Sequence, residues 1–190
     1  MFIQTEVTPN PATLKFLPGR TVLETGTADF ASPDGAEVSP LAMRLFEIPG
    51  VVGVFFGYDF ITITKDERED DGLDWAHLKP AVLGVIMEHF MSGQPVIIDN
   101  ASVPDDGEEF FEEADQQIVD TIKELLDTRV RPAVAQDGGD ITFRGFREGI
   151  VYLHMKGACA GCPSSTATLK HGIQNLLRHF IPEVSEVEAV

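Results

Sequence analysis

The chain has 190 residues, of which 43% are hydrophobic and 24% charged, and these ordinary globular values exclude wholesale disorder, a collagen-like repeat and a disulfide-rich mini-protein. The formal net charge of −17 argues against nucleic acid or an anionic membrane as a partner, because such a chain repels phosphate groups. The longest apolar runs, 51–57 and 81–87, are too short to span a membrane, and the first thirty residues lack an export or organelle signal, so we predict a cytoplasmic protein.

Residues 1–99 alternate between predicted strands and predicted helices. Strands are indicated by β-favouring runs bounded by turn formers, such as the Pro9-Asn10-Pro11 cluster that a helix could not cross. Helix starts are indicated by Ser39 followed by Pro40, and by Asp74. Pro80 lies inside the second helical pattern, so we expect a kink or a later start there. The predicted elements are strands over 2–8, 14–17, 51–56 and 60–64, the last two forming a hairpin, and helices over 39–48 and from 74 to about 90.

An acidic segment divides the chain. Residues 100–118 contain seven acids and no base, together with turn formers such as Pro104 and Gly107, which is typical of a self-repelling hinge. Residues 1–99 hold six bases and 15 acids, whereas residues 119–190 hold eight bases and nine acids. Because single cores usually occupy roughly 100 to 150 residues, we predict two small α+β domains, 1–99 and 112–190, joined by an acidic linker over 100–111.

The second domain is predicted to contain two helices, a β-hairpin and a final strand. An apolar stripe indicates a helix from about 112 to 130, with a bend at Pro132 and a stop at Gly138-Gly139. Strands over 141–146 and 150–155 are joined by the predicted three-residue loop Arg147-Glu148-Gly149. The remaining predicted elements are an amphipathic helix over 169–180 and a strand over 184–187.

The chain has two cysteines, Cys159 and Cys162, in a short loop between the hairpin and the following helix. We expect both sulfurs to project from this loop at the helix N-terminus, where the helix dipole and unpaired N–H groups stabilise thiolates. Gly157 and Gly161 let the backbone turn, and Pro163 suits the first helical turn. In a reducing compartment such a pair is more often metal-binding or redox-active than a structural disulfide.

The sequence around the cysteines avoids acidic residues. No Asp or Glu occurs in the 34 residues between Glu148 and Glu183, where the average density predicts five or six. An anionic guest would explain this gap, because a four-iron, four-sulfur core held by four thiolates carries net −2 and nearby carboxylates would raise its energy. A partly buried loop and helix that simply avoid acids are the alternative explanation.

Three interpretations of the cysteine pair are open. A thioredoxin-type oxidoreductase fits the strand-loop-helix context, but it needs roughly 60 residues beyond the motif, and only 28 follow Cys162. Zinc or an iron–sulfur cluster takes four thiolates, of which one chain supplies two, so a homodimer with the two loops facing across a two-fold axis would complete the set. A reduced pair without any bound partner is the third interpretation, although exposed thiols are an oxidative liability.

Other candidate site residues carry weaker signals. Ser164 and Ser165 lack a His-Asp constellation, so we expect them to cap the helix or to donate hydrogen bonds toward sulfur. Residues 137–140 could bind a cation but are more simply explained as a helix stop. No phosphate loop or dinucleotide fingerprint is present, and we predict that the protein is not an enzyme. Five histidines lie at no short ligand spacing from the cysteines: His77, His89, His154, His171 and His179.

Several stretches together match a known pattern. Around the cysteines they are Met155, Gly157, Cys159 and Gly161-Cys162-Pro163-Ser164-Ser165, preceded by Asp137-Gly138-Gly139-Asp140. This set closely resembles the signature of the Nfu family, whose C-terminal module is the NifU-like domain of iron–sulfur cluster assembly. The first half is similar to the Nfu N-terminal domain in three stretches: Thr8-Pro9-Asn10-Pro11, Leu14-Lys15-Phe16-Leu17-Pro18-Gly19 and Lys79-Pro80-Ala81-Val82.

The resemblance implies an iron–sulfur cluster scaffold or carrier. It implies a homodimer that binds one [4Fe-4S] cluster through Cys159 and Cys162 of each subunit and passes it to apo iron–sulfur proteins. Upstream cluster-assembly proteins would supply the cluster, and the first domain, which has no cysteine, would recognise donors or recipients. The alternative is a thiol-redox or zinc-structural interaction module that acts only by protein contact.

Overall fold

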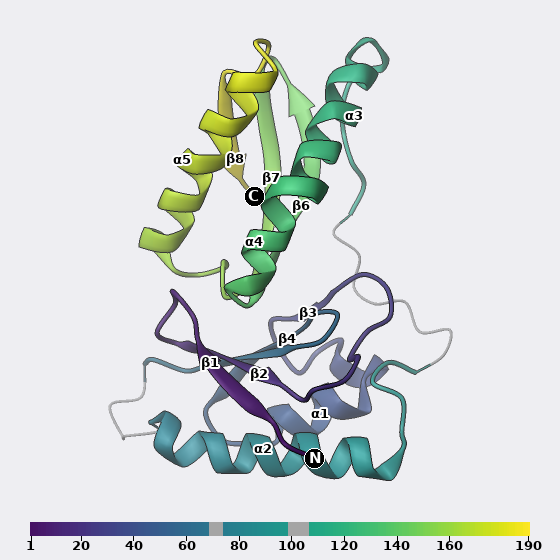
Figure 1. Ribbon diagram of the computed structural model, residues 1–190, viewed down its shortest axis with the longest axis vertical. Coiled ribbons are helices and arrows are strands. Elements are labelled where there is room, and N and C mark those ends of the chain that lie inside the picture. The colour runs from purple at the N-terminus through teal and green to yellow at the C-terminus, as the bar shows by residue number, and fades with distance from the viewer. Residues whose placement is uncertain (69–73, 99–106) are drawn as a thin grey trace. The chain divides into compact units, whose positions relative to one another are not determined.

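Two compact units make up the chain in the computed structural model, which describes residues 1–68, 74–98 and 107–190. Unit 1 is Met1–Asp105 and unit 2 is Asp106–Val190 (Figure 1). Each unit combines a sheet with helices, so the predicted α+β class with two small domains is confirmed. Most of the linker predicted over 100–111 lies outside the described residues. None of the helices in the described ranges is long and apolar enough to cross a membrane.

Unit 1 is built on a five-stranded antiparallel sheet. Its elements are β1 Gln4–Val7, β2 Thr13–Leu17, β3 Ala28–Phe30, a short 3-10 helix at Ala36–Val38, α1 Pro40–Phe46, β4 Val51–Phe56, β5 Ile61–Lys65 and α2 Trp75–Ser92. The strand order is β1-β2-β5-β4-β3. Figure 1 shows α1 and α2 together on one side of this sheet. Leu41 and Ile86 from the helices pack with Phe16, Phe56 and Ile63 from the strands in one core.

Local sequence signals explain much of unit 1. The predicted start of α1 is confirmed: Ser39 Oγ accepts a hydrogen bond from the Ala42 amide at 3.0 Å and donates one to the Val96 carbonyl at 2.6 Å. The predicted hairpin forms from β4 and β5. Helix α2 begins at Trp75 and continues through Pro80, so the expectation of a later start is wrong. Strand β3 was not predicted, because three residues are too few to show the alternation of apolar and polar side chains that indicates a strand.

Unit 2 has a three-stranded sheet with helices before and after the hairpin. Its elements are a 3-10 turn at Glu113–Asp115, α3 Gln116–Leu125, a π-helical turn at Leu126–Val130, α4 Arg131–Gln136, β6 Gly139–Arg147, β7 Ile150–Gly157, α5 Pro163–Phe180 and β8 Glu186–Ala189. Strands β6 and β7 are antiparallel, and β8 pairs in parallel with β7. Helix α5 makes the crossover between β7 and β8, as parallel pairing requires. Side chains of the sheet, α3 and α5 share one core, including Ile122, Ile141, Leu153, Ile173 and Leu177.

The structure corrects two predictions for unit 2. The helix predicted over about 112–130 starts at Gln116 and continues past a π-helical turn to Gln136. The hairpin loop has two residues rather than three, because Arg147 pairs with Ile150 in the sheet. Glu148 and Gly149 have φ values of 53° and 80°, the left-handed pair typical of a tight hairpin turn. The last helix starts at Pro163, as that proline predicts, and its apolar stripe begins six residues later.

The described end of the predicted linker is attached to unit 2. The Phe110 amide donates to the Arg144 carbonyl at 3.0 Å, and the Phe110 carbonyl accepts from the Phe146 amide at 2.9 Å. The Phe110 ring lies 5.1 Å from the Tyr152 ring. These contacts extend the sheet of unit 2 toward the linker, which the acidic composition of the segment did not indicate.

Candidate functional site: the cysteine loop of unit 2

The two cysteines lie in the loop between β7 and α5, as predicted. Cys162 occupies the N-cap position of α5 with an extended backbone, and Pro163 follows in the first turn. Gly157 and Gly161 have φ values of 63° and 76°, a left-handed conformation that favours glycine. Both cysteines are free thiols. The loop is therefore shaped by glycines and ends directly in a helix N-terminus.

Cys162 is the accessible thiol of the pair. Its side chain is partly exposed, and Ser164 Oγ lies 3.5 Å from Cys162 Sγ. Hydrogen bonds from Ser165 and Ser164 lower the pKa of Cys162 to about 7. These bonds stabilise the thiolate, so a large fraction of Cys162 is ionised at neutral pH. The expectation that the serines donate hydrogen bonds toward sulfur agrees with this geometry.

Cys159 is a buried thiol, which differs from the expectation that both sulfurs project. Its side chain is 7% exposed and belongs to the hydrophobic core of unit 2. Burial, together with the negative charges of Asp137 and Asp140, raises the pKa of Cys159 to about 12. The loop turns Cys159 inward between the end of β7 and the start of β6. Spacing along the chain could not reveal this, since both cysteines occur in the same short loop.

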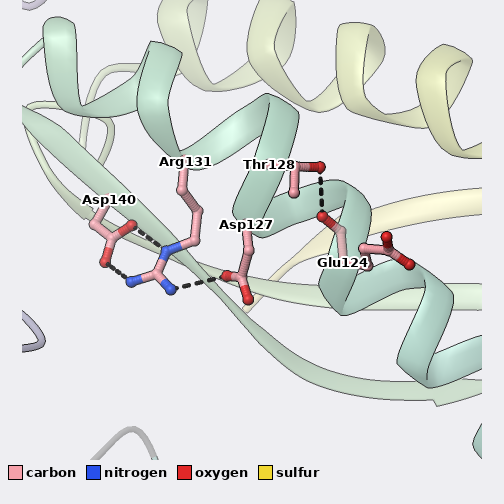
Figure 2. Close-up of polar contacts among 5 residues, drawn as sticks. All are labelled: Glu124, Asp127, Thr128, Arg131 and Asp140. Atoms are coloured by element: carbon pink, nitrogen blue, oxygen red, sulfur yellow. Dashed lines mark hydrogen bonds and ion pairs between the residues drawn. The ribbon is translucent and has the colours of Figure 1, made fainter.

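An ion pair between the half-buried Arg131 and the buried Asp140 lies close to Cys159. Figure 2 shows Arg131 of α4 between Asp140 and Asp127. Arg131 Nε and Nη2 donate to the two carboxylate oxygens of Asp140 at 2.9 and 2.8 Å, and Nη1 donates to Asp127 at 3.0 Å. Asp140 is only 4% exposed, and its hydrogen bonds raise the pKa of Arg131 above its ordinary value. Arg131 thus partly offsets the negative charge of Asp140, which disfavours a thiolate at Cys159.

The predicted helix stop at 137–140 has a second role. Gly138 ends α4 with a φ of 81°, as the stop interpretation requires. Asp140 instead belongs to the ion pair with Arg131. Sequence reasoning missed Arg131 because its partner lies nine residues away across a turn, with no local spacing rule to connect them.

Within the residues that the structure describes, no group of three or more His, Cys, Asp or Glu side chains could hold a metal ion. The five histidines and residues 137–140 therefore do not complete a site around the cysteines in one chain. Thiolates are ligands that zinc and iron–sulfur clusters favour, and either needs four of them or close substitutes. The loop supplies two sulfurs, so any such site would be finished by ligands from another molecule.

Comparisons with known proteins cover both units. Residues 3–93 match the family described as "Scaffold protein Nfu/NifU N terminal", and residues 122–188 match "NifU-like domain". The human protein "NFU1 iron-sulfur cluster scaffold homolog, mitochondrial" is 53% identical over 190 residues, a match that spans the whole chain and 72% of the relative. "NifU-like protein 4, mitochondrial" of Arabidopsis thaliana is 50% identical over 192 residues, which span 99% of this chain and 65% of the relative.

Among solved structures, the solution NMR structure of a NifU-like protein from Saccharomyces cerevisiae is 28% identical to this chain. The match covers 53% of this chain and 87% of that one, with a TM-score of 0.46.

The relatives correct the predicted location. The names of both the human and the Arabidopsis relatives state that they are mitochondrial, so the prediction of a cytoplasmic protein is wrong by this comparison. That prediction relied on the first thirty residues, whereas the relatives are longer than the stretch that matches this chain.

Proposed function

Since the chain belongs to the Nfu family of iron–sulfur cluster scaffold proteins, we propose that two copies bind one [4Fe-4S] cluster as cargo and pass it to apo iron–sulfur proteins. Cys159 and Cys162 of each copy would be the ligands. Upstream cluster-assembly proteins would deliver the cluster. The family is one of scaffolds rather than an enzyme class, and we propose that the chain turns over no small substrate.

The observation that carries this proposal is the number and placement of the thiols. The chain has two cysteines, the buried Cys159 and the partly exposed Cys162, both in the loop between β7 and α5, and the described residues offer no further side chains that would complete a four-ligand site. A cluster of this type takes four thiolates. Two loops related by a two-fold axis supply four, and in such an interface the same surface of each copy contacts its counterpart.

The charges around the loop suit an anionic cargo. No Asp or Glu occurs from 149 to 182, so the loop and all of α5 lack negative side chains. The nearby buried acid, Asp140, is paired with Arg131. A net −2 core with four thiolates is therefore met by few uncompensated negative charges.

The unequal exposure of the thiols suits release as well as binding. Transfer requires that an incoming thiolate of the recipient forms a bond to iron while one Fe–S bond to the scaffold breaks, after which the released cysteine can take up a proton. Cys162 is the partly exposed thiol, so an incoming thiolate can reach its iron first. Four ligands buried in a single pocket would hinder such stepwise exchange.

We also propose that unit 1 recognises protein partners. It contains no cysteine, so it cannot hold a cluster through thiolates. Residues 1–99 carry 15 acids and six bases, a balance that favours basic patches on donors or recipients. The domain boundaries proposed from the sequence, 1–99 and 112–190 with a linker over 100–111, would let unit 1 bind a partner while unit 2 exchanges the cluster.

A thiol-redox or zinc-structural module is the second candidate function. The difference between the pKa values, about 7 for Cys162 and about 12 for Cys159, is the kind of asymmetry that a dithiol redox pair uses. Zinc would accept the same four thiolates. Both alternatives predict a colourless protein with no sulfide.

Anaerobic reconstitution with iron and sulfide tests the proposal. We expect broad absorbance near 400 nm in the wild type, its loss in Cys159→Ser and in Cys162→Ser, and activation of an apo [4Fe-4S] dehydratase by the loaded wild type. Thr168→Ala, which removes a hydrogen bond to the Ser164 carbonyl within α5, is a matched control and should retain the absorbance. A colourless zinc-tetrathiolate wild type, or a loaded protein that never activates the apo-enzyme, would contradict the proposal.

A further inference from the structure

We infer that Gly139 and Thr166 are positioning residues that hold Cys159 in place for cluster binding. The inference rests on the proposed function and adds to it two residues that would not be cluster ligands. Gly139 opens β6 on one side of the cysteine loop, and Thr166 lies in the first turns of α5 on the other.

Gly139 lies directly against the cysteine loop. A Cβ atom at this position would be 2.6 Å from the Lys156 carbonyl oxygen, 2.7 Å from Cys159 Sγ and 3.1 Å from the Cys159 amide nitrogen. Two of these three atoms are backbone, so a new side-chain rotamer could not relieve the overlap. Any side chain at 139 would push the loop, and Cys159 with it, away from β6.

The requirement for glycine at 139 is steric. Gly138 has a left-handed φ of 81°, so its glycine serves the end of α4. Gly139 is not among the glycines with positive φ, so alanine could adopt its backbone conformation. Glycine is therefore needed at 138 for its backbone conformation and at 139 for lack of space, and of these two residues Gly139 is the one that contacts Cys159.

Thr166 fixes the same loop from the helix side. Its Oγ1 donates a 3.0 Å hydrogen bond to the Cys159 carbonyl, and its amide donates a 2.9 Å bond to the Cys162 carbonyl. One residue thus contacts the backbone of both cysteines. Because the side-chain bond reaches Cys159 alone, removing it should loosen Cys159 and leave the helix cap at Cys162 intact.

Contacts that hold a ligand side chain in position affect how tightly a site binds its metal. Residues that orient metal ligands typically change metal affinity by about 10 to 100-fold when they are mutated. A thiolate displaced by roughly 1 Å no longer meets its iron together with the other three sulfurs. Gly139 and Thr166 should therefore affect cluster retention while the fold of unit 2 persists.

The first test compares Gly139→Ala with Gly172→Ala in the full chain. Gly172 lies in α5, where a Cβ atom would meet nothing within 4 Å, so it is the matched control. We expect Gly139→Ala to retain the cluster about tenfold less well than wild type. In the cluster-free protein, peptide mass spectrometry should show faster alkylation of Cys159 with Cys162 unchanged. Wild-type retention together with a protected Cys159 in Gly139→Ala would overturn the role of Gly139.

The second test uses Thr166 and holds even if Gly139→Ala fails to fold. Thr166→Val removes the bond to Cys159, whereas Thr166→Ser keeps a donor and should restore wild-type behaviour. Thr168→Val is the control, because Thr168 Oγ1 makes an equivalent 3.0 Å bond to the Ser164 carbonyl within α5. We expect cluster loss several-fold faster in Thr166→Val alone, and equal rates for the two valine variants would overturn the inference. A wild type that binds no cluster would refute the proposed function, while the alkylation comparison would still test the positioning of Cys159.

Discussion

The two cysteines differ in their surroundings although two residues separate them. Cys162 caps α5 and receives hydrogen bonds from serines, whereas Cys159 lies in the core beside Asp137 and Asp140. Burial disfavours a charged sulfur, and hydrogen bonds to a thiolate favour it. Metal binding removes the thiol protons, so loading the cluster should release more protons from Cys159 than from Cys162 at neutral pH.

The thiolate of Cys162 should be visible in its reactivity. In the cluster-free protein, we expect the rate of Cys162 alkylation to rise with pH around a midpoint of about 7, because only the thiolate reacts and its fraction grows as pH passes the pKa. Ser165→Ala removes a bond that lowers this pKa, so the midpoint should move to higher pH. Thr168→Ala, one turn further along α5, serves as control. A midpoint that stays at the same pH in Ser165→Ala would show that the serine does not stabilise the thiolate.

At the scale of elements, the sequence predicts what local signals control. The Ser39 cap, the β4–β5 hairpin and the position of the cysteine loop before a helix all follow from patterns within a few residues. The π-helical turn at Leu126–Val130 does not, although Pro132, which cannot donate to a carbonyl four residues back, lies two residues after its end.

The burial of Cys159 also could not be predicted from local patterns, because it depends on the close approach of Gly139 in β6 to the cysteine loop. The Arg131–Asp140 pair connects α4 to β6 and is likewise a tertiary contact. The motif therefore indicates which residues are the candidate ligands, while packing between elements sets their exposure and charge.

The Arg131–Asp140 ion pair should stabilise unit 2. Arg131→Gln removes the positive charge that faces buried Asp140, and loss of one member of such a pair destabilises a fold. Arg131 itself is 36% exposed, so solvent screens part of the interaction, and we expect the free energy of unfolding to fall by about 1 to 3 kcal/mol. Urea titration with hydrogen exchange of β6 peptides measures this for unit 2. Asp127→Asn, at a 60% exposed side chain, should change it by less than about 0.5 kcal/mol, and equal losses in both variants would contradict the account.

Buried His89 should make unit 1 sensitive to acid. His89 of α2 is fully buried, and burial together with the charge of Arg44 on α1 lowers its pKa below the ordinary 6.5. Below pH 6.5, His89 therefore binds a proton in the unfolded chain but stays neutral in the folded chain. The free energy of unfolding decreases as the pH falls toward the folded-state pKa.

Fluorescence of Trp75, the single tryptophan, reports unfolding of unit 1 across this range. In His89→Leu, we expect the free energy of unfolding to decrease less steeply as the pH falls below 6.5. His77→Leu, at an exposed position on the same helix, should leave the slope unchanged. Identical slopes in wild type and His89→Leu would show that other groups cause the acid sensitivity.

For the whole molecule, we propose that cluster binding and partner recognition belong to different units. Unit 2 contains both thiols and a core of its own, and unit 1 has a separate core and most of the excess negative charge. Each unit can thus keep its fold while the other engages a partner. Under the proposed function, one chain carries half of the ligands, so that two copies share one cluster.

Native mass spectrometry after anaerobic reconstitution, combined with iron and sulfide analysis, measures how many chains hold one cluster. We predict a species of two chains that carries about four irons and four sulfides, and its dissociation to single chains when the cluster is removed. A single chain that retains four irons, or a two-chain species that contains zinc without sulfide, would contradict the account.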